Sequence, residues 1–272
     1  MSSTLLKADQ LGVALKQQGQ TTQLIQNLSF QLQKNQCLGI VGESGSGKSI
    51  TCKAILGLLR PPFQVTGTAL YQGEDLLSCS ESQMQQLRGK EIVMVLQHPM
   101  TAFDPLEPIG RQMTESLRVH RILSEKEAVG IAVEALEKLN IHHPKEVLKK
   151  YPHQVSGGML QRIMVGIALA AEPAIIIADE PTTAVDAVNV ATVISLFEQI
   201  KKREKTALIF ISHDLNVVAR LADHLVVMSE GKIVESGLTD TILQEPQHPK
   251  TRQLVGTREA LMNQFYRYVK WS

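Results

Sequence analysis

The spacing of apolar and polar residues predicts the first elements of the chain. Apolar and polar positions alternate within residues 11–15 and 28–32, which predicts two strands of an antiparallel layer. Residues 37–41 form a short, continuous apolar run, as expected for a strand buried on both faces. Glycine-rich residues follow, and apolar positions then recur at helical spacing over residues 49–59, up to the Pro61-Pro62 pair. The predicted order is therefore strand, glycine-rich loop and helix.

The pattern changes in the middle of the chain. Residues 65–77 again show short strand-like alternation, and residues 92–96 form another buried apolar run. From about residue 110 to residue 151 the segments are long, amphipathic and rich in charge, as in residues 125–140, and they contain few β-formers. This texture predicts a helical insertion, which we place at roughly residues 98–165.

Strands and helices alternate again after the insertion. Strands that alternate with crossover helices imply an α/β fold with a mainly parallel sheet, and ligands bind at the carboxyl ends of such strands. The predicted strands are residues 175–178, 207–211, 225–228 and 232–234, and the predicted helices are residues 189–202 and 215–223.

Length and composition narrow the class of protein. The 272 residues suffice for one large domain or two modest ones, and 43% of them are hydrophobic, which excludes a disordered chain. Lys and Arg number 28 against 27 Asp and Glu, and a net charge of +1 gives no electrostatic reason to expect a nucleic-acid partner.

Membrane, secretory and disulfide signals are weak. The longest apolar runs, residues 163–171 and 174–178, are shorter than a membrane helix requires, and the first ten residues lack the features of a secretory signal. We therefore expect the protein in the cytoplasm. Cys37, Cys52 and Cys79 are widely spaced, which argues against a disulfide framework, a zinc site or an iron–sulfur cluster.

One glycine-rich segment points to phosphate binding. Residues 42–49, GESGSGKS, fit the pattern G-x-x-x-x-G-K-[ST] and stand between a predicted strand and a predicted helix. Glycine lets the backbone curl so that successive N–H groups point at a β-phosphate, and the helix N-terminus adds partial positive charge. Lys48 is expected to bridge the β- and γ-phosphates, and the Ser49 hydroxyl to bind Mg²⁺. The alternative, a glycine-rich turn before an ordinary helix, is disfavoured by the complete pattern.

Two carboxylates follow the apolar run AIIIA. Asp179 and Glu180 stand at the end of that predicted strand, where a parallel sheet brings them beside the phosphate loop. Asp179 is expected to hold the metal ion, largely through water. Glu180 is expected to polarise the water that attacks the γ-phosphate, a general-base role. An ordinary strand end that runs into an acidic turn is the alternative.

A third motif suggests a family. Residues 155–162, VSGGMLQR, stand just before a helical apolar run, and Ser-Gly-Gly by itself is a common helix start. Together with the two motifs above, the sequence resembles the nucleotide-binding subunit of ABC transporters, whose signature has the form L-S-G-G-Q. The resemblance implies that Ser156 and Gly158 contact the γ-phosphate of ATP held by the opposite subunit.

The other elements of this family occur in the same order. Gln97 resembles the Q-loop glutamine, Asp186 the D-loop aspartate and His213 the switch histidine. The resemblance implies that Gln97 senses Mg²⁺ and the membrane partner, and that His213 contacts the γ-phosphate and positions the water at Glu180. The implied catalytic residues are Glu180, His213 and Gln97; the ATP-binding residues are Gly42, Glu43, Ser44, Gly45, Ser46, Gly47, Lys48, Ser49, Ile50, Asp179, Ser156, Gly157, Gly158 and Asp186; the Mg²⁺ ligands are Ser49, Gln97 and Asp179.

Two positions depart from the family pattern. Members usually stack adenine on an aromatic residue near the N-terminus, whereas residues 11–15 offer only Leu15 or a neighbour, so we expect weaker base stacking. The fifth signature position is Met159, as in the variant found in the peptide and nickel importer branch.

The resemblance implies a fold and a domain organisation. We expect an ABC-type P-loop NTPase with a RecA-like parallel-sheet core, an N-terminal antiparallel β layer and a helical subdomain at about 98–165. The ATPase domain is expected to span residues 1–255, followed by a short helical tail, 256–272. Leu261, Phe265 and Tyr268 share one face of that tail, which is expected to dock on its own domain or, alternatively, on the partner ATPase.

Three segments resemble the branch that imports dipeptides, oligopeptides and nickel. They are residues 95–105, 151–154 and 248–254. Many peptide importers carry a cysteine-containing extension after this point, and the absence of cysteine after Cys79 favours uptake of nickel or a metal chelate. A peptide importer is the alternative, and a soluble ABC ATPase or a small-molecule P-loop kinase is disfavoured.

The implied assembly is a membrane complex. Its partners are two membrane-spanning permease subunits, a second ATP-binding subunit that is a paralogue or a copy of this chain, and, indirectly, an extracytoplasmic solute-binding protein. The chain is then peripheral, on the cytoplasmic face of the inner membrane. Two further features are expected to be solvated surface: the pair His142-His143 and the basic residues 201–205.

Overall fold

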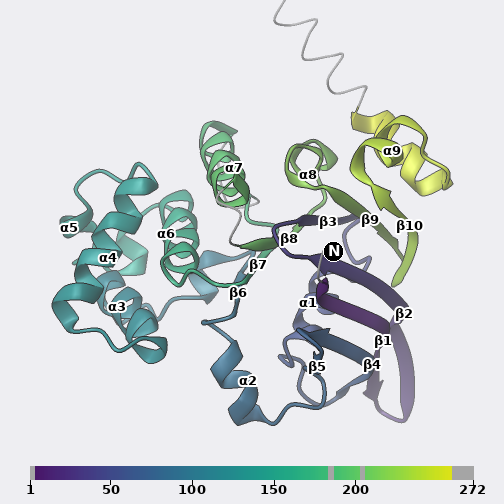
Figure 1. Ribbon diagram of the computed structural model, residues 1–272, viewed down its shortest axis with the longest axis horizontal. Coiled ribbons are helices and arrows are strands. Elements are labelled where there is room, and N and C mark those ends of the chain that lie inside the picture. The colour runs from purple at the N-terminus through teal and green to yellow at the C-terminus, as the bar shows by residue number, and fades with distance from the viewer. Residues whose placement is uncertain (1–3, 183–186, 203–205, 259–272) are drawn as a thin grey trace, which may run out of the picture. The chain divides into compact units, whose positions relative to one another are not determined.

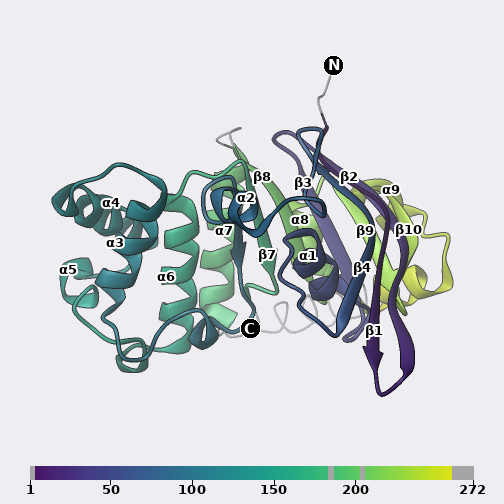
Figure 2. The same cartoon turned by 90° about the horizontal axis from the view of Figure 1, so that it is seen from below.

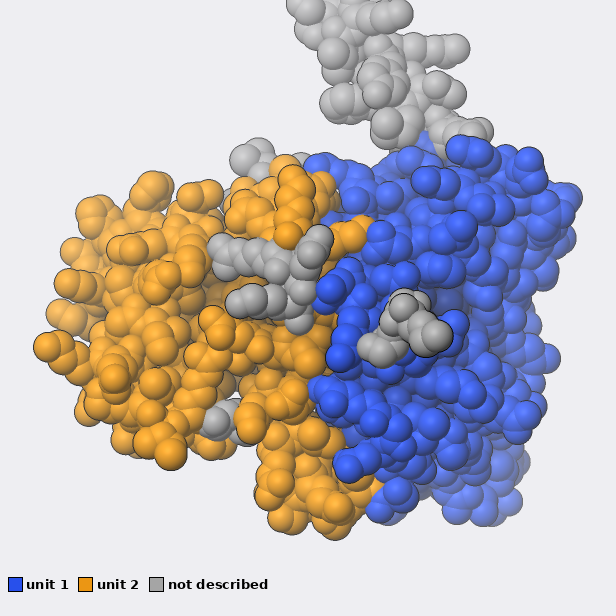
Figure 3. Space-filling model, in the orientation of Figure 1, with its two compact units in different colours: residues 1–78, 209–272 blue, residues 79–208 orange. Residues whose placement is uncertain are grey.

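The computed structural model describes residues 4–182, 187–202 and 206–258 (Figure 1). The chain divides into two compact units, which Figure 3 colours separately. Unit 1 comprises residues 1–78 and 209–272, and unit 2 comprises residues 79–208. The tail residues 259–272, for which a helix and a docking face were predicted, lie outside the described residues.

Unit 1 contains the predicted antiparallel layer. Its strand order is β2-β1-β4-β5, and β1 and β2 form the long hairpin seen in Figure 2. Gln18 and Gly19, both at positive φ, make the two-residue turn of this hairpin. Leu11 of β1 faces Leu28 of β2, and both side chains are buried. The strands are β1 (Thr4–Gln17), β2 (Gln20–Gln33), β4 (Phe63–Tyr71) and β5 (Glu74–Asp75).

Unit 1 also contains a second layer with buried strands. β3 (Cys37–Gly42) pairs in parallel with β9 (His224–Ser229), and β9 pairs antiparallel with β10 (Lys232–Leu238). Every residue of β3 is buried, as its continuous apolar run predicts. The helices of this unit include α1 (Lys48–Ile55), α8 (Leu215–Leu221) and α9 (Thr239–Gln244), and residues 249–258 are helical as well.

Unit 2 combines strands with the helices predicted for the middle of the chain. β6 (Ile92–Val95) pairs in parallel with β7 (Ile175–Asp179). β8 (Ala207–Ser212) is fully buried and contains the sequence boundary between the units. The helices are α2 (Glu81–Leu87), α3 (Ile109–His120), α4 (Glu125–Lys138), α5 (Pro144–Val147), α6 (Gly157–Ala170) and α7 (Ala187–Lys202), and the 3₁₀ turns are η1 (Pro99–Thr101) and η2 (Pro152–Gln154).

Small residues bring the helices of unit 2 close together. α3, α4 and α6 lie side by side in Figure 2. The buried face of α4 contains three alanines and Leu136. A Cβ added at Gly166 of α6 would lie 2.6 Å from a methyl group of Leu139, so that methyl group would have to shift to admit even an alanine.

Elements that differ from the sequence expectation include α1, which ends early, and α2 and α9, which were not predicted. The helix predicted over residues 49–59 ends at Ile55, because Gly57 takes a left-handed conformation and its N–H binds the carbonyl of Ala54. The sequence reasoning missed α2, whose apolar pattern is weak because Met84 is its one buried residue. Its signal was the capping box: Ser80 accepts from the Gln83 N–H, and the Gln83 side chain accepts from the Ser80 N–H.

Candidate functional site

The glycine-rich segment of unit 1 forms a tight loop between β3 and α1. Gly45 and Gly47 have φ angles of 79° and 100°, a backbone conformation that glycine tolerates best. At Gly42, an added Cβ would lie 2.2 Å from the carbonyl oxygen of Met228 in the neighbouring strand β9. The loop also binds the β9–β10 turn, since the Gly231 N–H donates to the carbonyl of Ser46 at 3.1 Å. The phosphate loop is therefore held against β9 and the β9–β10 turn by close packing and a hydrogen bond.

Lys48 begins α1 and turns back over the loop. Its side chain is buried, at 5% exposed, and Nζ donates to the carbonyls of Gly42 at 2.9 Å and Glu43 at 3.0 Å. The helix cap is Gly47, which offers no side-chain acceptor to the first N–H groups of α1. A cation and a set of N–H donors thus meet at one helix N-terminus, an arrangement that fits an anionic phosphate.

The remaining loop residues differ in exposure. Glu43 and Ser44 are exposed, whereas Ser49 and Ile50 are partly buried in the first turn of α1. The Glu43 carboxylate makes an ion pair with Lys250 at 3.1 Å, a contact across 207 residues of sequence. Sequence reasoning gave Lys250 no role, because nothing in the local pattern shows that this lysine returns to the loop.

His213 lies in unit 1, directly after β8, and its side chain is exposed. The backbone around it is held on both sides. The Asp214 N–H donates to the Ser212 hydroxyl at 3.0 Å, and the Asp214 carboxylate caps α8 by accepting from the Asn216 N–H at 2.8 Å. Asn216 in turn accepts from the Arg258 guanidinium at 3.1 Å.

Unit 2 brings Gln97 and Glu180 together. Gln97 follows β6, Glu180 follows β7, and Nε2 of Gln97 donates to a carboxylate oxygen of Glu180 at 3.3 Å. Glu180 has a φ of 45°, which is strained for a residue with a side chain. Asp179, the last residue of β7, is 3% exposed. The parallel pairing of β6 with β7 explains this arrangement, because it places both strand ends at the same edge.

The Ser-Gly-Gly motif starts helix α6, as predicted. Ser156 is the N-cap, and its hydroxyl oxygen accepts from the Met159 N–H at 3.2 Å. Gly157 and Gly158 form the first helical turn, with Gly157 exposed. Asp186, the predicted D-loop residue, lies outside the described residues.

A groove of about 570 Å³ lies in unit 2 beside the segment that follows Gln97. Its lining combines apolar side chains with three carboxylates and the guanidinium of Arg88. The apolar lining includes Met94, Phe103 and Met164, and the acidic lining is Asp104, Glu107 and Glu115. Sequence reasoning expected a groove near Gln97 but did not identify these residues.

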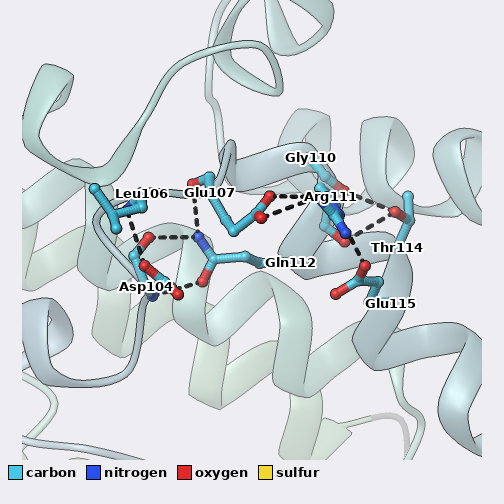
Figure 4. Close-up of polar contacts among 8 residues, drawn as sticks. All are labelled: Asp104, Leu106, Glu107, Gly110, Arg111, Gln112, Thr114 and Glu115. Atoms are coloured by element: carbon cyan, nitrogen blue, oxygen red, sulfur yellow. Dashed lines mark hydrogen bonds and ion pairs between the residues drawn. The ribbon is translucent and has the colours of Figure 1, made fainter.

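A polar network of α3 and the segment before it lies beside this groove (Figure 4). The Arg111 guanidinium binds Glu115 at 2.9 Å and Glu107 at 2.9 Å. The hydrogen bond to Glu115, followed by the charges of Glu107 and Glu115, raises the pKa of the Arg111 guanidinium above its ordinary value. The Asp104 carboxylate accepts the Leu106 N–H at 2.8 Å, and no cation is recorded beside it in the part of the chain that the structure describes.

Within residues 4–182, 187–202 and 206–258, no helix combines the length and apolarity that crossing a bilayer requires. The same residues contain no cluster of three or more His, Cys, Asp or Glu side chains arranged to hold a metal ion.

Comparison with known proteins identifies relatives over most of the chain. Residues 25–183 match the family model for the ABC transporter. The chain is 45% identical over 242 residues to the metal-staphylopine import system ATP-binding protein CntD of Staphylococcus aureus, a match that covers 89% of both proteins. It is 44% identical over 259 residues to the oligopeptide transport ATP-binding protein OppD of Bacillus subtilis, covering 94% of this chain and 72% of that protein.

Solved structures agree on the fold. The ATP-binding cassette MJ0796, in a dimeric post-hydrolysis state bound to ADP and Pi, superposes with a TM-score of 0.78 at 22% identity and covers 86% of this chain and 98% of that one. The predicted α/β fold with an antiparallel layer and a parallel sheet is confirmed, as are the predicted family and the role as ATP-binding, ATP-hydrolysing subunit of an importer. On these matches, the chain belongs to the ABC transporter family.

Proposed function

We propose that this chain is the peripheral ATPase subunit of a complex that imports a metal chelate, such as nickel bound to an organic chelator. In that complex two permease subunits span the inner membrane, and this chain binds them from the cytoplasmic face. A second ATP-binding subunit and an extracytoplasmic solute-binding protein complete it. The observation that carries ATP binding is the loop at residues 42–50, where Lys48 and the uncapped N-terminus of α1 converge.

Each loop residue has a proposed role. The backbone N–H groups of Gly45, Ser46 and Gly47 bind the β-phosphate, while Gly42, Glu43, Ser44 and Ile50 shape the loop around it. When ATP binds, the Lys48 ammonium leaves the carbonyls of Gly42 and Glu43 for the β- and γ-phosphate oxygens. The exchange is favourable, because phosphate oxygens carry more negative charge than peptide carbonyls.

Mg²⁺ fits the donors that the chain offers for it. Ser49, Asp179 and Gln97 supply a hydroxyl, a carboxylate and an amide oxygen, which are the oxygen ligands that Mg²⁺ prefers. When bound, the ion would neutralise charge on the β- and γ-phosphates.

Hydrolysis is assigned to Glu180. Its carboxylate accepts a proton from the water that attacks the γ-phosphate, a contribution of roughly 10² to 10⁴ in rate. The Gln97 amide orients that carboxylate through the 3.3 Å hydrogen bond. His213 is proposed to contact the γ-phosphate and to hold the attacking water.

The signature residues are proposed to act on a second subunit. Ser156, Gly157 and Gly158 stand at the start of α6, where free N–H groups and the helix dipole favour an anion. They would contact the γ-phosphate of ATP bound by the opposite ATPase subunit, with Asp186 at the same interface. We further propose an ATPase domain of residues 1–255 with a helical subdomain at about 98–165, followed by a tail at 256–272.

The permease is proposed to dock in the groove beside Gln97. A short cytoplasmic helix of a permease subunit would bury apolar side chains against Phe103 and Met164. The Asp104 carboxylate, which lines the groove, favours a cation on the docked permease helix, because Asp104 has no ion-pair partner among the described residues. The groove thus links the membrane partner to the Gln97–Glu180 pair.

The choice of a metal chelate is supported by one comparison. CntD of Staphylococcus aureus, whose name describes metal-staphylopine import, is 45% identical across 89% of both proteins. The oligopeptide relative is 44% identical, so a peptide importer is the second candidate for the solute.

Uptake assays separate the two solutes. Cells that lack other nickel routes would carry either the wild-type chain or Glu180→Gln, and uptake of radiolabelled nickel with and without a chelator would be compared with uptake of a labelled dipeptide. Loss of chelate-dependent nickel uptake alone supports the proposal. Loss of dipeptide uptake with intact nickel uptake replaces it by the peptide importer, and loss of neither solute refutes both.

A further inference from the structure

The segment of residues 102–108 joins η1 to α3 and forms one wall of the groove. Ala102, Phe103, Asp104 and Glu107 all line the groove from this segment. The hydrogen bond between backbone groups inside the segment is long, since the Glu107 N–H reaches the carbonyl of Asp104 at 3.3 Å. Leu106 is 82% exposed. Within the segment the Asp104 carboxylate also accepts the Leu106 N–H at 2.8 Å, and contacts from neighbouring elements add to this internal support.

Gln112 of α3 supplies such contacts with its whole side-chain amide (Figure 4). Its oxygen accepts from the Asp104 N–H at 2.8 Å. Its nitrogen donates to the carbonyl of Asp104 at 2.9 Å and to the carbonyl of Glu107 at 2.8 Å. One side chain thus binds three backbone groups of the segment, a pattern that an amide can make because it is both donor and acceptor.

The other end of the segment leads back to Gln97. In η1, the Thr101 N–H and hydroxyl both donate to the carbonyl of His98, at 3.0 and 2.7 Å, and the Ala102 N–H donates to the carbonyl of Pro99 at 2.9 Å. Pro99 is buried. Hydrogen-bonded backbone therefore runs from the residue after Gln97 to the part of the groove wall that Gln112 holds.

We propose that Gln112 is a positioning residue for coupling: it fixes the groove wall so that movement of a docked permease helix reaches Gln97 and, through it, Glu180. The inference rests on the proposed function, because it requires a permease in the groove. Without Gln112 the segment can deform locally, and displacement of the docked helix is absorbed there before it reaches Gln97.

The chemistry of the amide selects the test variants. Gln112→Glu keeps the size of the side chain but replaces the two donated bonds by repulsion between its carboxylate and two carbonyl oxygens. Gln112→Ala removes all three bonds. Thr114→Val is the matched control, because the Thr114 hydroxyl binds the carbonyls of Gly110 and Arg111 inside its own helix and does not line the groove.

The test compares ATP hydrolysis by the two ATP-binding subunits alone with hydrolysis by the full complex in lipid vesicles, both without solute. We expect both Gln112 variants to hydrolyse ATP within about two-fold of wild type when the permease is absent. We expect them to lose at least four fifths of the change in rate that the permease produces, whereas Thr114→Val keeps it.

Two results would overturn the proposal. In the first, the permease changes the rate of ATP hydrolysis by both Gln112 variants as much as it changes the wild-type rate. In the second, the variants lose the same share of their hydrolysis rate with and without the permease, which indicates a purely structural role. Circular dichroism and melting of each variant accompany the assay, and Gln112→Glu decides if Gln112→Ala does not fold. Because the readout needs no solute, failure of the metal-chelate proposal appears separately, as absent nickel uptake by the wild type.

Discussion

The amide nitrogen of Gln97 donates a hydrogen bond of 3.3 Å to the carboxylate of Glu180, across 83 residues of sequence. Glu180 holds this position with a φ of 45°, a left-handed conformation that costs roughly 1–2 kcal/mol for a residue with a Cβ. Strain of this kind persists where the surrounding structure enforces it, here the end of the buried strand β7. Through this hydrogen bond, Gln97, which precedes the segment beside the groove of unit 2, contacts Glu180, the proposed general base.

Glu180→Gln tests the general base directly. The amide keeps the size of the side chain but accepts no proton, so we expect nucleotide binding to survive and turnover to fall by roughly 10² to 10⁴. Phosphate release and binding of a fluorescent ATP analogue measure the two quantities, and the closed dimer is expected to accumulate. Turnover close to that of the wild type would remove Glu180 from this role.

Two glycine substitutions separate close packing from backbone strain in the phosphate loop. In Gly42→Ala the new Cβ lies 2.2 Å from a backbone oxygen of β9, a clash that no rotamer relieves. We therefore expect the free energy of unfolding to fall by about 3 kcal/mol and ATP binding to be lost. In Gly45→Ala no atom of the described part of the chain lies within 4 Å of the Cβ, and the left-handed φ alone costs about 1 kcal/mol. Denaturant unfolding ranks the two variants, and equal losses would contradict the assignment.

Ser46→Ala should not destabilise the nucleotide-free protein. The Ser46 hydroxyl is buried and has no hydrogen-bond partner among the residues that the structure describes, so its removal ends a desolvation cost. We expect an unchanged melting temperature or a rise equivalent to about 1 kcal/mol. Thr51→Val is the control: the Thr51 hydroxyl donates to the carbonyl of Gly47 at 2.9 Å, and its loss should lower stability. A fall in both variants would show that Ser46 is bonded.

Glu235 anchors the segment that leads to Lys250. Its two carboxylate oxygens accept the N–H groups of Gln247 and His248, both at 2.9 Å. Burial alone would raise the pKa of Glu235, but the Gln247 N–H, the Thr251 side chain, the His248 N–H and the charge of His248 together outweigh it and hold the pKa below its ordinary value of 4.5. We expect Glu235→Gln to cost about 1–2 kcal/mol at neutral pH and to lower the melting temperature by about 2–5 °C.

The sign of the pH dependence follows from the lowered pKa. A group with a depressed pKa in the folded state stabilises above its unfolded pKa, and this stabilisation disappears as the pH falls through the folded pKa. The melting-temperature difference between wild type and Glu235→Gln should therefore be constant near pH 7 and shrink below the ordinary value of 4.5. Glu230→Gln, at an exposed turn residue, is the control and should show no such difference at any pH.

Much of the local structure was predictable because its causes are local. The alternation in residues 28–32 and the apolar run at 37–41 correspond to β2 and β3, since burial of one or both faces sets the pattern of the strand itself. Ser156 at a helix start is equally local, because an N-cap needs only a side chain and a backbone N–H three residues on. Among the misses, the early end of α1 comes from a left-handed glycine and the omission of α2 from a nearly polar helix, and α9 was not predicted either.

By itself the sequence determined the order of most elements, the phosphate-loop chemistry and the resemblance to a family, because each depends on residues that are neighbours in the chain. Only the tertiary structure decided which distant residues meet: Gln97 with Glu180, Glu43 with Lys250, and Gln112 with the segment before α3. These contacts arise where strand pairing and helix packing bring separate segments together, and side-chain spacing along the chain carries no trace of them. The proposals on hydrolysis and coupling rest on these contacts.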